Sequence, residues 1–170
     1  MGRLIFLTGG VRSGKSSAAV RTAAELDRPT LFVATAMATD GDMSARIARH
    51  RAERPAQWRT VEAVEGTLAE HVAGPEETLV LDCLTLYVSR RMGEGAREAE
   101  VTREVEKALG LMRDGFETAI VVSNEVGSGV IPANALARTF SEALGRANQA
   151  AAATADEVLL MVSGLPLKVK

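Results

Sequence analysis

The sequence predicts an α/β fold with a mainly parallel sheet and helices on both faces of the sheet. Short apolar runs alternate along the chain with Ala-, Glu- and Arg-rich stretches of helical composition, as in chains built from βαβ units. Three of these runs are continuously apolar rather than alternating, namely Leu4–Leu7, Leu79–Leu81 and Ala119–Val122. Strands of that kind are covered on both faces, which favours a parallel sheet between two layers of helices.

The predicted strands are the short runs that carry β-branched or other apolar residues between turn signals. They lie near Arg3–Thr8, Thr30–Ala34, Arg59–Ala63, Thr78–Leu81, Thr118–Ser123 and Glu157–Val162. The predicted helices fill the intervals, and the punctuation at Gly74-Pro75 and Gly115 ends helical runs. They cover Lys15–Leu26, Ser44–Ala52, Thr67–Val72, Thr85–Met92, Arg97–Arg113 and Asn134–Thr154.

The length of 170 residues predicts a single domain, residues 1–170, because compact domains commonly have ~100 to 200 residues. Apolar residues make up 46% of the chain and charged residues 25%, which excludes a mainly disordered protein. The formal net charge is −2 and aromatic residues make up only 4%. The chain therefore lacks the basic field and the stacking surfaces that nucleic-acid binders use, and we expect no nucleic-acid partner.

Cys83 is the only cysteine, so an internal disulfide and a cysteine-built zinc or iron–sulfur site are excluded. A reducing compartment fits this composition best. The first apolar run ends at Gly9-Gly10, far short of a signal segment or of the ~20 residues that span a membrane. We therefore expect a cytoplasmic protein without a membrane span.

The strongest motif is the phosphate-binding pattern G-x-x-x-x-G-K-[ST], which is matched at every fixed position by Gly9, Gly10, Val11, Arg12, Ser13, Gly14, Lys15 and Ser16. A buried strand leads into the motif and an alanine-rich helix follows it. In that context, backbone amides and the helix N-terminus hold phosphate oxygens, Lys15 adds a positive charge and the Ser16 hydroxyl reaches Mg²⁺. The alternative is a glycine-rich turn that binds nothing.

A P-loop needs a carboxylate for its magnesium, usually at the end of a neighbouring buried strand. Asp82 closes the run Thr78–Leu81 and is the first candidate. Glu125 follows the strand at Thr118–Ser123 and is the second, because it also emerges at the sheet edge where α/β folds bind ligands. Either acid can instead be a helix cap or a solvated strand end.

The segment from Arg46 to Arg54 carries four arginines and His50, one of two histidines in the chain. On a helix, Arg46, His50 and Arg54 share one cationic face. Arginines suit phosphate oxygens, and an imidazole can act as a base or as a nucleophile toward phosphorus. Read alone, such a charge run is more often a solvated helix face. His71 has no comparable neighbours, and we expect it to be structural.

Taken together, these motifs resemble the bifunctional adenosylcobinamide kinase / adenosylcobinamide-phosphate guanylyltransferase family of cobalamin biosynthesis. The resemblance spans almost the whole chain and is carried by an ordered series of motifs. These are Gly9–Ser16, Ala34-Thr35-Ala36, Met43–Ile47, His50-Arg51, Arg54–Thr60, Asp82–Thr85, Ser123–Gly127, Gly145–Gln149 and Ser163–Leu167.

The resemblance implies a RecA-like P-loop NTPase fold, a homotrimer and two reactions on one site. The first reaction phosphorylates adenosylcobinamide with ATP or GTP. The second transfers GMP from GTP, through a guanylyl-histidine intermediate, to adenosylcobinamide phosphate, giving adenosylcobinamide-GDP. By the same resemblance His50 and Lys15 are catalytic, and Ser16 and Asp82 hold Mg²⁺. Further nucleotide contacts map onto Ala34, Thr35, Ala36, Arg51, Ala52, Glu53, Arg54, Glu62 and Asp82.

The chain departs from some members of that family at two positions. Arg49 stands where some members have a second histidine just before the nucleophile, and Asp82 stands where some have Glu. Two other classes of function compete with the resemblance. A simple metabolite kinase would use the Arg46–Arg54 segment only as a phosphate lid, and a GTP-dependent switch would need an N-K-x-D element, which this sequence lacks.

Overall fold

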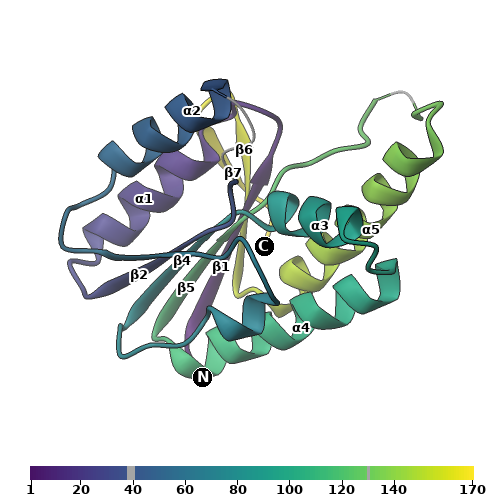
Figure 1. Ribbon diagram of the computed structural model, residues 1–170. Helices are drawn as coiled ribbons and strands as arrows, with labels where there is room; N and C mark the ends of the chain where they lie inside the picture. Colours follow the sequence, from purple (N-terminus) through teal and green to yellow (C-terminus); the bar gives the residue numbers. More distant parts are fainter. Residues whose placement is uncertain (38–40, 130) are drawn as a thin grey trace.

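The computed structural model describes residues 1–37, 41–129 and 131–170. The chain forms one sheet of seven strands in the order β3-β2-β4-β5-β1-β6-β7. All neighbouring strands run parallel except the pair β6 and β7. The α/β fold with a mainly parallel sheet and flanking helices is therefore confirmed (Figure 1).

The strands of the sheet follow the predicted runs closely, with one addition near the C-terminus. They are β1 Arg3–Gly9, β2 Thr30–Ala34, β3 Arg59–Glu62, β4 Thr78–Asp82, β5 Thr118–Val122, β6 Glu157–Val162 and β7 Leu165–Lys168. The helices are α1 Lys15–Glu25, α2 Gly41–Ala52, α3 Leu84–Gly93, α4 Glu98–Gly115 and α5 Ala135–Thr154, with the 3₁₀ turn η1 at Leu68–Glu70.

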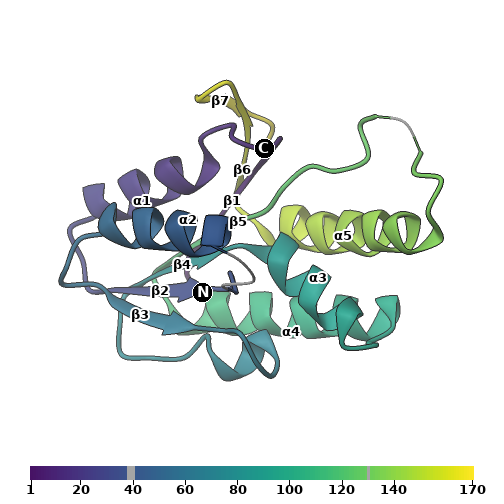
Figure 2. The same ribbon diagram turned by 45° about the horizontal axis from the view of Figure 1, so that its top comes forward.

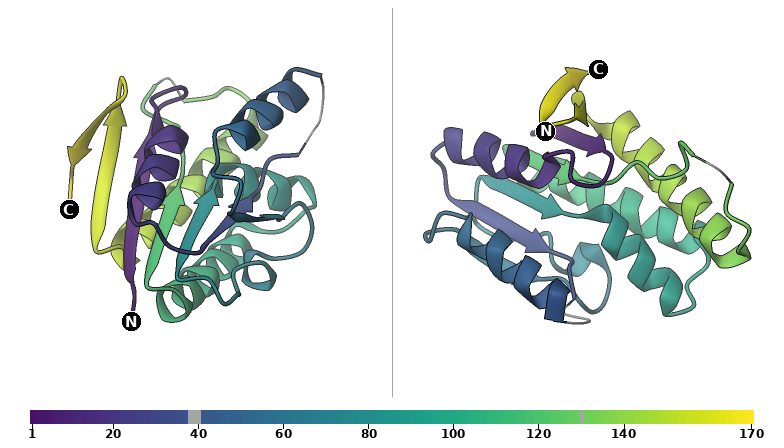
Figure 3. Two further views of the ribbon diagram at one scale, coloured as in Figure 1. Left: turned by 90° about the vertical axis from the view of Figure 1, so that its left-hand side faces the viewer. Right: turned by 90° about the horizontal axis from the view of Figure 1, so that it is seen from above.

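The helices cover the two faces of the sheet unequally. Helices α1 and α2 lie on one face, and α3, α4 and α5 lie on the other (Figures 2 and 3). Central strands are buried on both faces, since β5 has no exposed residue and Leu79, Val80 and Leu81 of β4 are fully buried. Burial of these apolar runs is the dominant stabilising contribution to such a core. The parallel strands end at one edge, which the P-loop and α2 flank in Figure 1.

The structure differs from the predicted elements in two places. The helix expected over Thr67–Val72 is only the short 3₁₀ turn η1, whose capping box joins Thr67 and Glu70. That box satisfies the local backbone within one turn, and no amphipathic length follows to extend the helix. The second difference is β7, which was not predicted.

Strand β7 is short and exposed, and it contains Pro166. A prediction based on apolar runs does not detect a strand of this kind. It pairs antiparallel with β6 through the turn Ser163-Gly164, where both residues have positive φ, 50° and 86°. Such backbone angles belong to the two-residue hairpin turns that match strand twist. Proline is tolerated because β7 is an edge strand.

Candidate nucleotide site at the P-loop

The P-loop backbone connects β1 to α1 with two glycines in left-handed conformations. Gly9 has φ 146° and Gly14 has φ 91°. A Cβ atom on Gly9 would lie 2.5 Å from the carbonyl oxygen of Met161, and one on Gly14 would lie 3.2 Å from Cα of Gly164. Only glycine combines these angles with this proximity. The predicted loop geometry therefore depends on Gly9 and Gly14.

Lys15 lies folded against the loop rather than extended into solvent. Its side chain is buried, and Nζ donates to the carbonyl oxygen of Gly10 at 2.5 Å and to Oγ of Ser13 at 3.2 Å. The backbone N–H of Gly164 donates to the carbonyl oxygen of Ser13 at 3.0 Å. The β6–β7 hairpin therefore contacts the P-loop at Ser13. The sequence did not predict this contact, because it did not predict β7.

Asp82 lies at the end of β4, close to the start of α1. Burial raises the pKa of its carboxyl group. A hydrogen bond from the Ser16 side chain opposes that rise in pKa, as do the nearby charges of His50, Arg54 and Lys15. These influences show that Asp82 sits among the P-loop and the α2 residues predicted for the site. The structure brings both predicted magnesium residues, Ser16 and Asp82, into contact.

Glu125, the second candidate acid, has different partners. Its carboxylate accepts from Oγ1 of Thr8 at 2.8 Å and from Nδ2 of Asn148 at 3.4 Å. Its backbone N–H donates to the carbonyl oxygen of Gly9 at 3.0 Å. The described partners of Glu125 therefore belong to β1 and α5 rather than to Ser16 and Lys15. This geometry favours Asp82 as the magnesium-site acid.

Magnesium fits this set of residues. Within the three described ranges no group of three or more His, Cys, Asp and Glu side chains could hold a metal ion. Mg²⁺ does not need such a group, because it binds through one or two carboxylates, substrate phosphates and water. A single acid, Asp82, next to the Ser16 hydroxyl is the donor set that a metal–nucleotide complex uses in a P-loop.

Helix α2 carries His50 in its last turn, together with Arg49 and Arg51. His50 is partly buried, and its charge acts on the Asp82 carboxyl. Arg51 is exposed and pairs with Glu62 at the end of β3, with an N–O distance of 2.5 Å. The predicted residues His50, Arg51 and Glu62 are thus gathered at the sheet edge. The side chains of Met43 and Arg46 lie outside the described part of α2.

Arg54 follows α2 and lies over an aromatic pair. Its guanidinium carbon is 3.6 Å from the centroid of the Phe32 ring, and Phe32 stacks on Trp58 with centroids 6.4 Å apart. Burial lowers the pKa of Arg54, and the nearby Asp82 carboxylate partly offsets this. Among the described residues the buried Nε of Arg54 has no hydrogen-bond partner. The stacked rings of Phe32 and Trp58 therefore hold the Arg54 guanidinium near Asp82.

The segment Ala34-Thr35-Ala36 leaves β2 at the same edge. Thr35 is buried, and its hydroxyl both accepts from the backbone N–H and donates to the carbonyl oxygen of Cys83, at 2.7 Å in each case. The Thr35 side chain thus ties the end of β2 to the residue after Asp82. The backbone N–H of Thr35 also donates to the carbonyl oxygen of Asp82 at 3.1 Å, and Ala34 packs against the core. The remaining predicted contacts, Ala52 and Glu53, are exposed at the end of α2.

A P-loop between a buried parallel strand and a helix, with a strand-end acid beside it, defines a nucleotide-binding enzyme of the P-loop class. Over residues 5–169 the sequence matches the family model described as cobinamide kinase / cobinamide phosphate guanyltransferase. The chain belongs to this family, as its motifs predict.

Relatives of the same family match over nearly their full length. The bifunctional adenosylcobalamin biosynthesis protein CobU of Salmonella typhimurium is 36% identical, over 98% of this chain and 99% of its own length. The protein of the same name from Escherichia coli is 35% identical over the same shares. The bifunctional adenosylcobalamin biosynthesis protein CobP of Pseudomonas aeruginosa is 41% identical, over 96% of this chain and 95% of its own length. In the described ranges, no helix has the length and apolar character needed to cross a bilayer.

Proposed function

We propose that the protein phosphorylates adenosylcobinamide with ATP or GTP and then guanylylates the product through His50, giving adenosylcobinamide-GDP. The observation that carries this proposal is the position of His50, which lies near Asp82 at the P-loop edge of the sheet. Helix α2 and the P-loop flank the same edge of the sheet (Figure 1), so a nucleotide on the P-loop would have its phosphates at the edge where His50 lies. Membership of the kinase and guanyltransferase family supports the same assignment.

In the kinase step the acceptor hydroxyl attacks the γ-phosphorus, and the bond to the β,γ-bridging oxygen breaks. Such a reaction needs positioning and charge neutralisation more than covalent chemistry. The amides of the loop from Gly9 to Ser16 and the Lys15 ammonium supply these to the triphosphate. Bound Mg²⁺, held by Ser16 and Asp82, would neutralise charge that develops on the phosphate oxygens.

In the guanylyl step a ring nitrogen of His50 attacks the α-phosphorus of GTP. A nitrogen–phosphorus bond forms, the bond from the α-phosphorus to the α,β-bridging oxygen breaks, and pyrophosphate leaves. A phosphate oxygen of adenosylcobinamide phosphate then attacks the same phosphorus and releases the imidazole. Arg51 follows His50 in the chain and pairs with Glu62, and Arg54 lies near Asp82. Both guanidinium groups could neutralise phosphate charge at this edge.

The proposal also covers the assembly and location of the protein. We infer a homotrimer from the family resemblance and a cytoplasmic location from the single cysteine and the absence of any predicted membrane span. Sedimentation equilibrium of the purified protein tests the trimer. A stable monomer or dimer at micromolar concentration would contradict it.

Incubation with α-labelled GTP and Mg²⁺, followed by peptide mapping, tests the proposed function directly. We expect covalent label on a peptide that contains His50. A simple metabolite kinase with the same P-loop would use the triphosphate without trapping GMP. Complete absence of covalent label, with phosphoryl transfer intact, would therefore favour that second class of enzyme.

The magnesium assignment predicts an unequal response of the two strand-end acids. We expect Asp82→Asn to raise the Mg²⁺ concentration needed for half-maximal turnover by about tenfold or more, because it removes a charged ligand from the metal site. Glu125→Gln should change that concentration by less than about twofold. Titration of Mg²⁺ at saturating nucleotide measures both. A larger rise for Glu125→Gln would reverse the assignment.

The buried Asp82 carboxylate also predicts a change in stability. Its pKa is raised in the folded protein, so the folded state binds the proton more tightly than the unfolded state. The contribution of Asp82 to the free energy of unfolding then falls as pH rises from the unfolded pKa through the folded pKa. Near neutral pH, Asp82→Asn should therefore raise the Tm of the nucleotide-free protein. An unchanged or lower Tm, measured beside Glu125→Gln as the matched variant, would contradict this.

A further inference from the structure

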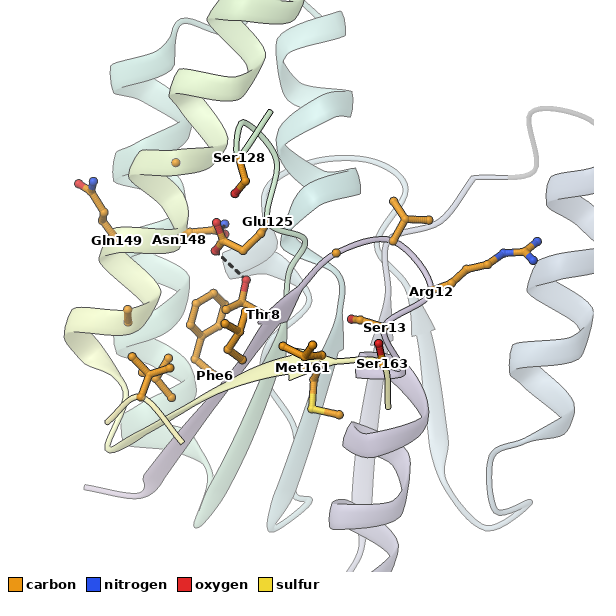
Figure 4. Close-up of a pocket in the computed structure, with 18 residues that line it drawn as sticks. Phe6, Thr8, Arg12, Ser13, Glu125, Ser128, Asn148, Gln149, Met161 and Ser163 are labelled. Carbon is orange, nitrogen blue, oxygen red and sulfur yellow. Dashed lines mark hydrogen bonds between the residues drawn. The ribbon is translucent and has the colours of Figure 1, made fainter. Parts of the chain in front are cut away.

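A cavity of about 910 Å³ opens beside the P-loop, on the side of α5 and β6 (Figure 4). One wall is the loop itself, through Gly10 and Ser13. The apolar part of the lining includes Phe6, Leu160 and Met161. The cavity is lined neither by His50 nor by Asp82, so it is separate from the proposed nucleophile and from the proposed magnesium-site acid.

Glu125 is the acid of this cavity, and several contacts hold it in place. Figure 4 shows its carboxylate beside Thr8, whose hydroxyl donates to Oε1 at 2.8 Å. Asn148 of α5 donates to the same oxygen at 3.4 Å and to the carbonyl oxygen of Asn124 at 3.0 Å. Only one carboxylate oxygen, Oε1, takes part in these bonds. Glu125 nevertheless remains exposed to the cavity.

Asn148 points to a polar ligand for the same wall. Its side chain is 8% exposed and lines the cavity. Among the described residues, its buried Oδ1 has no hydrogen-bond partner. A buried amide oxygen without a donor costs about 1–3 kcal/mol. A modest shift of this side chain would let a ligand donor or a water satisfy it.

Four residues of the P-loop, Gly10, Val11, Arg12 and Ser13, line the cavity. Of these, Gly10 and Ser13 accept hydrogen bonds from Nζ of Lys15. The backbone N–H of Glu125 is bonded to Gly9, the first residue of the loop. A molecule in the cavity would therefore lie against the loop that holds the phosphates, within reach of both the loop and Glu125.

We propose that this cavity is the acceptor site of the kinase step, and that Glu125 is the base for the acceptor hydroxyl. The inference rests on the proposed function, because that function supplies an alcohol acceptor. The apolar lining suits the hydrocarbon part of the arm that carries the hydroxyl. The polar wall of Glu125, Thr8 and Asn148 suits the hydroxyl itself.

The step balances without any further reactant. The acceptor O–H proton passes to Oε2 of Glu125, and the hydroxyl oxygen forms a bond to the γ-phosphorus. The bond from that phosphorus to the β,γ-bridging oxygen breaks, and its electron pair leaves on the nucleoside diphosphate. The protonated Glu125 then returns its proton to water. Asn148 acts as a positioning residue, because its Nδ2 donates to Oε1 and holds the carboxylate while Oε2 takes the proton.

The experiment compares Glu125→Gln with the parent in two assays. One is phosphoryl transfer from MgATP or MgGTP to adenosylcobinamide, and the other is covalent labelling of the protein by α-labelled GTP without acceptor. We expect kcat for phosphoryl transfer to fall by about 10²-fold or more, the usual effect of losing a general base. The initial rate of labelling should change by less than about twofold, because that step uses no acceptor. Glu125→Asp should keep more kinase activity than Glu125→Gln.

Glu142→Gln is the matched control, because Glu142 is an exposed acid on α5 outside the cavity lining. It should leave both rates at the parent level. Kinase activity of Glu125→Gln within about twofold of the parent would overturn the proposal. So would a raised KM for nucleotide with equal loss in both assays, since the cavity would then hold the nucleotide. If the parent enzyme shows no phosphoryl transfer at all, the proposed function itself fails instead.

Discussion

Replacing His50 by alanine is expected to separate the two activities. Guanylyl transfer should fall by at least about 10³-fold, because a lost covalent nucleophile leaves only binding and electrostatic stabilisation. Phosphoryl transfer to adenosylcobinamide should persist, because the acceptor hydroxyl attacks the γ-phosphorus directly and needs no protein nucleophile. Parallel assays of the two reactions on the purified variant measure the split.

The chemistry of the trapped label adds a second readout. A histidine–phosphorus bond is a phosphoramidate, so label from α-labelled GTP should be lost in acid and survive alkali. It should map to a peptide containing His50 and be absent from His50→Ala. His71→Ala is the control, because the His71 ring is hydrogen-bonded to the carbonyl oxygen of Glu65 at 2.8 Å. This contact does not involve the P-loop. It should label normally.

Three outcomes would change the mechanism. Acid-stable label would indicate an ester of Ser or Thr rather than a phosphoramidate. Label retained in His50→Ala would place the nucleophile elsewhere. Equal loss of both activities would mean that His50 also positions the nucleotide for phosphoryl transfer, as its closeness to Asp82 would permit.

The second large effect is expected for Lys15→Ala, which should lower both reactions by about 10²-fold or more. The chain has one G-x-x-x-x-G-K-[ST] match, so one loop must hold the triphosphate for both steps. The Lys15 ammonium already lies against the loop through Gly10 and Ser13, so its loss removes a preorganised positive charge. Steady-state rates with saturating MgGTP measure the effect.

Lys107→Ala serves as the matched control, because Lys107 is an exposed lysine on α4. It should keep both activities at the parent level. If Lys15→Ala kept either reaction near the parent rate, the two reactions would not share one phosphate site. The single-site account of both steps would then be wrong.

Local sequence was enough to predict the P-loop and the strands that position it. The loop pattern carries its own geometry, because Gly9 and Gly14 occupy backbone conformations that favour glycine. Continuously apolar runs such as Leu79–Leu81 predict buried strands, and Asp82 ends one of them. The family was also predictable from motif order, as the match over residues 5–169 confirms.

The sequence ranked Asp82 ahead of Glu125 as the magnesium-site acid, but it did not show which residues either acid contacts. Asp82 and Glu125 both follow buried strands, and the pattern along the chain is similar for each. Their difference comes from partners distant in sequence, Ser16 for Asp82 and Thr8 for Glu125. Contacts between residues far apart depend on strand order, which local patterns do not encode.

By itself, the sequence determined the fold class and the phosphate-binding loop, because both follow from residue types at fixed local spacing. The family followed from the resemblance that the ordered series of motifs carries along the chain. Only the tertiary structure revealed the hydrogen bond from the β6–β7 turn to Ser13 and the stacking of Arg54 on Phe32. The cavity that Glu125 shares with the loop emerged in the same way. Each of these features joins segments separated by many residues, and they meet only because burial of the apolar strands brings the segments together at one sheet edge.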